Sequence, residues 1–119
     1  MANDPKRSRK AKWLLENLFT SLNNQNDGYD VIDIRHFNAD DFLELLIRVQ
    51  SYNGLAGIWG IESFESKTGY FFDVRTTPRG KSPADVNWYT EAFFALLAGK
   101  SDETELYFTA TFWIAEELL

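Results

Sequence analysis

The sequence predicts an α+β fold, in which an N-terminal helix precedes a ferredoxin-like βαββαβ unit with a four-stranded antiparallel sheet and its helices on one face. Three observations lead to this prediction. Residues 106–114 alternate apolar and polar side chains with the period of a strand. Segments 38–54 and 82–99 each begin with an N-cap residue and end at a glycine, as helices do. Residues 55–75 contain two strand-like runs separated by a turn, as in a β-hairpin.

The composition fits a single domain over residues 1–119, long enough to bury about two-thirds of its unfolded surface. Hydrophobic residues make up 45% of the chain, which is ample for a core. The chain has no cysteine and one histidine, so we expect no disulfide, no metal and no cofactor. No apolar signal-peptide core and no membrane-spanning run is visible, so we expect a soluble, cytoplasmic protein.

The N-terminal part, residues 1–28, is expected to form an amphipathic helix and a linker before an α/β core at 29–119. Asp4 and Pro5 are suited to an N-cap and to the first helical position. Apolar residues then recur at helical spacing, namely Ala11, Leu14, Leu15, Leu18, Phe19 and Leu22. This pattern predicts a helix over 5–24. Its apolar stripe must be covered, so we expect it to cap the open sheet face or to pair with another subunit.

The core is expected to begin with a strand at 29–37, followed by a helix that Asn38 caps with Asp41 at the capping-box position. The strand alternates apolar and charged residues at Ile32, Asp33, Ile34 and Arg35. The helix should end near Asn53 and Gly54, which are typical helix-stop residues.

The central hairpin is expected to join strands at 55–65 and 70–75. Gly57 and Gly60 interrupt the first of these apolar runs and predict a bend or bulge there. The last strand, 106–114, follows a polar turn at 100–105.

The second core helix has several start signals, with Ser82 as N-cap, Pro83 at the first helical position and Asp85 at the capping-box position. Gly99 is expected to end it. The preceding loop contains Gly80-Lys81-Ser82 between a strand and a helix, as a phosphate-binding loop does. That motif also needs a glycine five positions before Gly80, where this chain has Arg75, so we do not expect nucleotide binding.

Nucleic acid is not the expected partner either. Residues 67–74 run loosely parallel to the aromatic RNA-stacking motif on the third strand of RNA-recognition domains. However, Asp73 lies within the motif, and Asp33 occupies the first strand where a stacking aromatic is wanted. The net charge is −6, and residues 1–12 carry +4, so the remaining residues carry −10, which repels phosphate.

No catalytic constellation is visible, so we expect a protein that is not an enzyme. His36 has no nucleophile at any local spacing, and it is interpreted as an ordinary strand-end histidine. The acidic pair Asp40 and Asp41 is better explained as helix-start residues than as metal ligands, because no alternating oxygen-ligand loop is present.

The surplus of aromatic residues favours a protein-binding surface, since tyrosine and tryptophan are enriched at interfaces. The predicted partner-binding residues are four aromatics and three loop cations: Trp59, Phe71, Tyr107, Trp113, Arg75, Arg79 and Lys81. The aromatics could instead be buried by the N-terminal helix.

These observations lead to a hypothesis: a small, acidic protein that binds another protein, as an inhibitor or accessory protein on a larger, basic and nucleic-acid-handling target. Two alternatives remain open, a sensor of small molecules or peptides that uses the open sheet face, and a homodimeric, chaperone-like accessory protein. A homodimer would form through the N-terminal helix or the sheet face. No membrane partner is expected.

Overall fold

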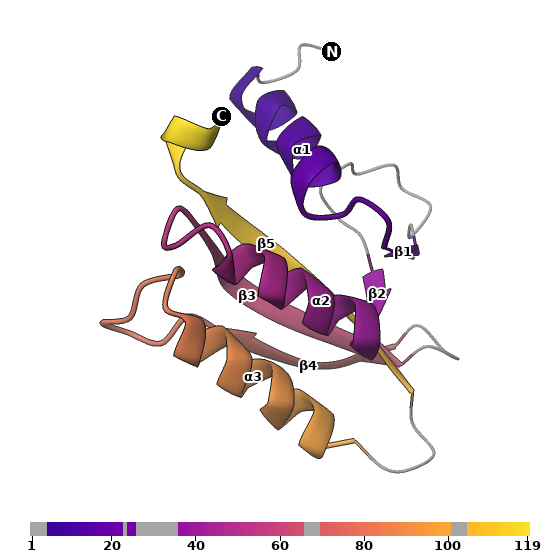
Figure 1. The fold of residues 1–119 in the computed structure, drawn as a ribbon. Coiled ribbons are helices and arrows are strands. Elements are labelled where there is room, and N and C mark those ends of the chain that lie inside the picture. Colours follow the sequence, from indigo (N-terminus) through magenta and orange to yellow (C-terminus); the bar gives the residue numbers. More distant parts are fainter. Residues whose placement is uncertain (1–4, 23, 26–35, 66–69, 101–104) are drawn as a thin grey trace.

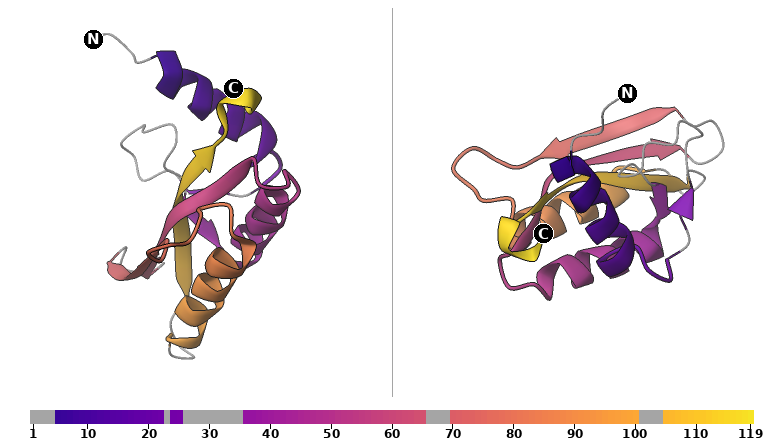
Figure 2. Two further views of the ribbon diagram at one scale, coloured as in Figure 1. Left: turned by 90° about the vertical axis from the view of Figure 1, so that its left-hand side faces the viewer. Right: turned by 90° about the horizontal axis from the view of Figure 1, so that it is seen from above.

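The computed structural model describes residues 5–22, 24–25, 36–65, 70–100 and 105–119 (Figure 1). Its elements in chain order are α1 (Pro5–Asn17), β1 (Asn24–Gln25), β2 (His36–Asn38), α2 (Ala39–Gln50), β3 (Ala56–Glu65), β4 (Phe71–Thr76), α3 (Val86–Ala98), β5 (Leu106–Ile114) and the 3-10 helix η1 (Glu116–Leu118). The predicted α+β class is confirmed, because four antiparallel core strands carry α2 and α3 on one face (Figure 2).

The strand order along the sheet is β1-β2-β5-β3-β4, and every neighbouring pair is antiparallel. From β2 onward the elements follow the predicted βαββαβ order, with the β3–β4 hairpin present, but β1 adds a fifth strand to the four that were predicted. The ferredoxin-like topology is not confirmed, because the last core strand, β5, lies between the first, β2, and the second, β3. The order of elements along the chain does not determine the order of strands across the sheet. Four strands in these directions can be arranged in more than one antiparallel order. The long pairing of β3 with β5, from Ala56 opposite Ile114 to Glu65 opposite Leu106, occupies the centre.

The core lies between this sheet and the helices, and aromatic rings from three elements meet in it. The ring of Phe42 on α2 lies 5.4 Å from that of Phe93 on α3 and 5.4 Å from that of Phe108 on β5. The rings of Phe93 and Phe108 are 5.0 Å apart, edge to face. Such contacts add about 0.5–1.5 kcal/mol per pair to the hydrophobic burial and fix both helices on the sheet.

The C-terminal half of α1 and the turn after it pack into the core on the helix side of the sheet, so α1 does not cap the open face. Leu14 and Leu18 are fully buried in the shared core. The ring of Phe19 lies 5.2 Å from Phe37 and 5.6 Å from Phe112, both of which face the helices. The Arg48 guanidinium on α2 donates to the Leu18 carbonyl oxygen at 3.0 Å. The apolar stripe of α1 is therefore covered by its own chain.

Helix α1 is also shorter than the predicted span of 5–24. It ends at Asn17, and Ser21 adopts a left-handed φ of 67°, which turns the chain toward β1. The two residues of β1 then pair with Phe37 and His36, where the sequence suggested only a linker. Of the strand predicted at 29–37, only its end is seen, as β2; Ile32, Asp33, Ile34 and Arg35 lie outside the described residues.

The two core helices differ in how well their starts were predicted. Asn38 caps α2 as expected, with its side-chain oxygen accepting from the Asp41 N–H at 2.8 Å. The prediction of Ser82 as the cap of α3 is wrong, because Asp85 caps it by accepting from the Asn87 N–H at 2.9 Å. The carbonyl of Pro83 instead accepts the Ile58 N–H at 2.8 Å, so it is used by the sheet rather than by a first helical turn.

The predicted bulge in β3 is confirmed at Trp59, where the register with β5 shifts between Ile58 and Gly60. Before the bulge, Ile58 faces the core, and after it Ile61 and Ser63 do so. The bulge therefore moves the core-facing positions from even to odd residue numbers. This shift decides which later side chains of β3 reach the opposite, helix-free face.

Candidate protein-binding surface

The helix-free face of the sheet presents a mixed aromatic and polar surface, which we call the sheet surface. Helices α2 and α3 lie on the other side of the sheet, and α1 crosses one end of it (Figure 2). The side chains that the register and burial place on it include His36 from β2, Trp59, Glu62 and Phe64 from β3, Phe71 and Val74 from β4, and Tyr107, Thr109, Thr111 and Trp113 from β5.

An aromatic row crosses four strands at one end of the sheet surface. Phe64 on β3 is directly opposite Tyr107 on β5 and Phe71 on β4. The Phe64 and Phe71 rings meet edge to face with centroids 5.9 Å apart, and the His36 imidazole lies 5.1 Å from the Phe64 ring. Cross-strand aromatic pairs of this kind hold each other in fixed orientations. These ring contacts therefore favour one arrangement of the row.

Much of the apolar area on the sheet surface is open to solvent. Phe71 is 56% exposed, Trp59 47% and Val74 39%. Tyr107 and Trp113 are half-buried, so both present part of a ring to solvent. Neighbouring exposed aromatics on a monomer are typical of binding sites.

A second aromatic group lies at the other end of the sheet surface. Trp113 is opposite Gly57, and Trp59 bulges out of β3 beside Thr111. Tyr107 and Trp113 are six residues apart on β5, which corresponds to about 20 Å along an antiparallel strand. Between the two groups lie Thr109, Thr111 and the exposed Glu62. The surface thus has two aromatic ends and a polar centre.

The basic loop lies beside the Trp59 end of this surface. The Thr77 N–H donates to the Trp59 carbonyl at 2.8 Å, and the Lys81 N–H donates to the Pro78 carbonyl at 3.0 Å. These bonds fix the loop that carries the exposed side chains of Arg79 and Lys81. The loop cations can therefore contact the same partner as Trp59.

Arg75 and Phe71 lie on opposite sides of the sheet, although the sequence analysis placed both in the predicted partner-binding set. Arg75 is opposite Ile61, a core-facing residue, so its position in the register is on the helix side of the sheet. Its guanidinium forms an ion pair with Asp73 at 2.9 Å. Of the seven predicted residues, the structure brings Phe71 and Tyr107 into one row, and it brings Trp59 next to the loop of Arg79 and Lys81.

Sequence reasoning missed His36 and Phe64, the two residues that link the aromatic row. Phe64 faces solvent only because the bulge at Trp59 reverses the alternation of β3. His36 was interpreted as an isolated strand-end residue, yet its ring packs on Phe64 from two strands away. Exact knowledge of the strand order and the bulge position would have been needed to find either.

Comparison with known proteins does not assign this chain to a family. No family model, curated protein or solved structure matches this chain. Within the described residues, no group of three His, Asp or Glu side chains is arranged to hold a metal ion. In that same part of the chain, none of the helices has the length and apolar character needed to cross a bilayer. The functional argument therefore rests on the geometry of the surfaces.

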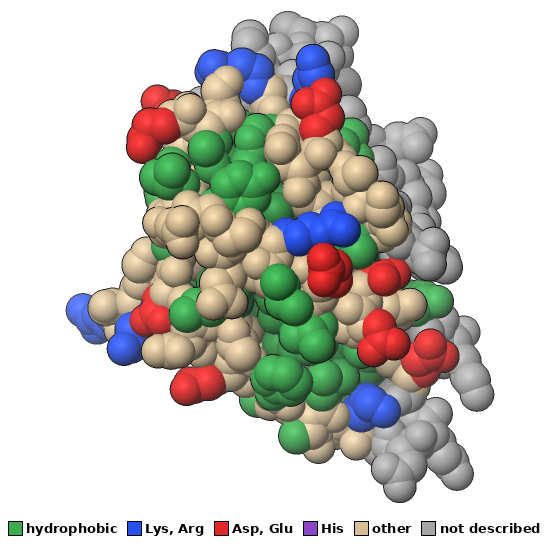
Figure 3. All heavy atoms as spheres, viewed as in Figure 1, with side chains coloured by type: hydrophobic (Ala, Val, Ile, Leu, Met, Phe, Trp, Pro, Cys, Tyr) green, Lys and Arg blue, Asp and Glu red, His purple; other side chains and the backbone are tan. Residues whose placement is uncertain are grey.

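The helix layer also exposes apolar side chains, and it is the main rival as a contact surface. Viewed from that side, apolar residues gather over α2 and α3 with acidic side chains around them (Figure 3). Ile47 is 53% exposed, Phe94 50% and Leu43 36%. This patch differs from the sheet surface in chemistry, because Phe94 packs on Phe93 of its own helix and no described ring from another element reaches it.

Proposed function

We propose that this chain is a non-enzymatic protein-binding module that docks its sheet surface onto a larger protein, as an inhibitor or accessory protein. The observation that carries the proposal is the pairing of Phe64 with Phe71, whose ring is held in place while 56% of the residue stays exposed. A rigid, exposed aromatic loses little conformational entropy on binding, which is the property of interface hot spots.

The charges on and near this surface favour a protein over a nucleic acid. Glu62 lies in its centre, and the cations Arg79 and Lys81 stand only at one end. A nucleic acid partner would need cations along the path of its phosphates, as well as aromatic rings. A protein partner needs only a complementary rim around the aromatic contacts.

The N-terminal helix contributes less to this proposal than the sheet. Leu14 and Leu18 are buried against the helix's own chain, and Leu15 is the large apolar residue of α1 that is more than a third exposed among those described. The sheet surface is therefore the favoured contact, whether the partner is another protein or a second copy of this chain.

The proposal can be tested with a matched pair of phenylalanine variants. Phe71→Ala removes an exposed ring from the sheet surface, and Phe94→Ala removes an equally exposed ring from the helix layer. Both chains, and the wild type, would be used as bait for quantitative affinity capture, with the mass of each bait in solution measured alongside. We expect Phe71→Ala to reduce recovery of the captured protein at least about tenfold, as the loss of a hot spot does.

The comparison also shows which result would overturn the proposal. Equal recovery with wild-type and Phe71→Ala bait, or a loss confined to Phe94→Ala, would exclude the sheet surface as the contact. Recovery of RNA that ribonuclease removes, with no protein, would replace it with nucleic-acid binding. A wild-type dimer that Phe71→Ala dissociates would identify the partner as a second copy.

A further inference from the structure

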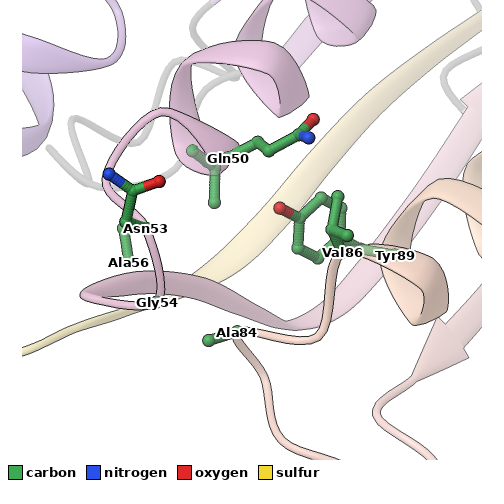
Figure 4. Close-up of a pocket in the computed structure, with 8 residues that line it drawn as sticks. Gln50, Asn53, Gly54, Ala56, Ala84, Val86 and Tyr89 are labelled. Atoms are coloured by element: carbon green, nitrogen blue, oxygen red, sulfur yellow. The ribbon is translucent and has the colours of Figure 1, made fainter.

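A pocket of about 210 Å³ lies on the helix side of the sheet, away from the sheet surface. It is formed where the end of α2 and the following turn face the start of α3 (Figure 4). Its volume would hold about seven water molecules at about 30 Å³ each. A ligand with a similar number of non-hydrogen atoms would therefore fit.

The pocket contains a buried hydroxyl group with no protein partner in the described part of the chain. Tyr89 is only 1% exposed, and its hydroxyl points into the pocket (Figure 4). No hydrogen bond joins this hydroxyl to another described residue, although Trp88 beside it donates its indole N–H to the Ile58 carbonyl at 3.0 Å. A buried tyrosine hydroxyl normally has a partner, and leaving it without one destabilises the fold.

The pocket wall is held in place by contacts that do not involve the hydroxyl. The Ile58 N–H donates to the Pro83 carbonyl at 2.8 Å, which fixes the loop before α3 on β3. Asp85 caps α3 through the Asn87 N–H. The Tyr89 side chain is therefore positioned before any ligand arrives, as in a preorganised site.

The chemistry of the lining selects an uncharged ligand. Its polar side chains are the Tyr89 hydroxyl and the carboxamides of Gln50 and Asn53, and no Lys, Arg, His, Asp or Glu lines it. The remaining side chains are short and aliphatic, from Val49, Ala56, Ala84 and Val86. Burial, and secondly the nearby Asp85 carboxylate, raise the pKa of Tyr89, so its hydroxyl stays protonated and can donate. The same carboxylate disfavours an anionic ligand.

We propose that this pocket binds a small uncharged molecule that carries an amide or lactam group, with the Tyr89 hydroxyl donating to its carbonyl oxygen. Gln50 and Asn53 are exposed residues at the rim of the pocket, and the carboxamide of each offers one donor and one acceptor side to such a group. The aliphatic side chains contact the rest of the ligand. This site is independent of the proposed protein-binding function.

The test is a titration of the full chain with three probes of seven non-hydrogen atoms each, followed by NMR of the methyl groups. The probes are δ-valerolactam, cyclohexanone, which lacks the N–H, and the valerate anion. We expect δ-valerolactam to shift the methyl signals of Ala56, Ala84 and Val86 in a saturable way, and to bind more tightly than either other probe. No saturable shift, or shifts elsewhere on the chain, would overturn the proposal.

Two variants identify the atoms involved. Tyr89→Phe should weaken δ-valerolactam binding about three- to tenfold, as the loss of one hydrogen bond does, while Tyr70→Phe, outside the pocket, should leave it unchanged. Tyr89→Phe should also be at least as stable as wild type without the probe, since its hydroxyl has no described partner. Ala84→Leu should fill the pocket and abolish binding. An unchanged lactam affinity in Tyr89→Phe, or lactam binding that persists in Ala84→Leu, would overturn the proposal, as would marked destabilisation by Tyr89→Phe.

Discussion

The carbonyl oxygen of Pro83 lies 2.3 Å from the point where a side chain on Gly57 would place its β-carbon. This close approach is what allows the loop before α3 to lie on β3 and the Ile58 N–H to bond to Pro83 at 2.8 Å. The loop in turn carries Arg79 and Lys81 at one end of the sheet surface and sets the first turn of α3, where Tyr89 stands. One glycine thus positions parts of both candidate sites.

Gly57→Ala should therefore destabilise the protein by about 2–3 kcal/mol, because the new methyl group must displace backbone and not a flexible side chain. Gly60→Ala is the matched control in the same strand. Its added β-carbon would find its nearest neighbour at 3.5 Å, an ordinary contact, so we expect a change below about 1 kcal/mol. Urea unfolding of both variants measures the two free energies, and similar values would contradict the tight contact at Pro83.

The start of α3 leads to a second prediction. Asp85→Ala should cost about 1 kcal/mol of stability, because it removes the side-chain acceptor of the Asn87 N–H. Ser82→Ala should cost less than about 0.5 kcal/mol, since Ser82 accepts only a local bond from the Ala84 N–H at 3.1 Å in an exposed turn. Thermal or urea unfolding distinguishes them. A larger loss of stability in Ser82→Ala than in Asp85→Ala would indicate that Ser82 is the N-cap.

The sequence was sufficient to predict those parts of the fold that depend only on residues close together in the chain. The alternation over 106–114 predicted β5 with the bounds that it has, and Asn38 with Asp41 predicted the start of α2. Capping at Asn38 needs only residues within one turn. The same holds for the bulge, because Gly57 and Gly60 weaken the strand that contains them.

Long-range contacts account for the errors. The sequence predicted Ser82 as the cap of α3 and Asp85 as its capping-box residue. Asp85 caps the helix instead, and the preceding loop is held by a bond between Pro83 and Ile58, 25 residues away. Likewise, the strand order and the side of the sheet that α1 covers depend on pairings between distant segments. The contacts of Phe64 and His36 within the aromatic row also depend on such pairings. The positions of Phe71 and Tyr107 on the open face could therefore be predicted, and the contacts that link them could not.

The raised pKa of Tyr89 predicts a loss of stability in alkaline solution. The folded state holds the phenol proton more tightly than the unfolded chain, in which the pKa is about 10.0. The stability that the protonated Tyr89 contributes to the folded state is therefore fully present below about pH 10. It is lost as the pH rises from there through the pKa of the folded state. Tyr89→Phe cannot ionise, so its stability relative to wild type should rise above about pH 10. Urea unfolding at a series of pH values measures this difference, and a difference that does not change with pH would contradict the burial of the phenol.

The aromatic row gives the last prediction, which separates its internal support from its exposed end. Phe64→Ala removes the ring that both His36 and Phe71 contact, so it should cost about 1–3 kcal/mol, somewhat less than the roughly 3–5 kcal/mol of a fully buried phenylalanine. The ring protons of His36 should also lose the ring-current shift that Phe64 imposes at 5.1 Å. Trp59→Ala, outside the row, should leave those His36 signals in place. Proton NMR of the three proteins checks this, and unchanged His36 signals in Phe64→Ala would mean that His36 does not lie on Phe64 in solution. The same variants can be used as bait. If Phe64→Ala and Phe71→Ala both fail to capture the protein that the wild type captures, the row binds as a unit. If Trp59→Ala keeps part of the affinity, the Trp59 end of the sheet surface contributes separately.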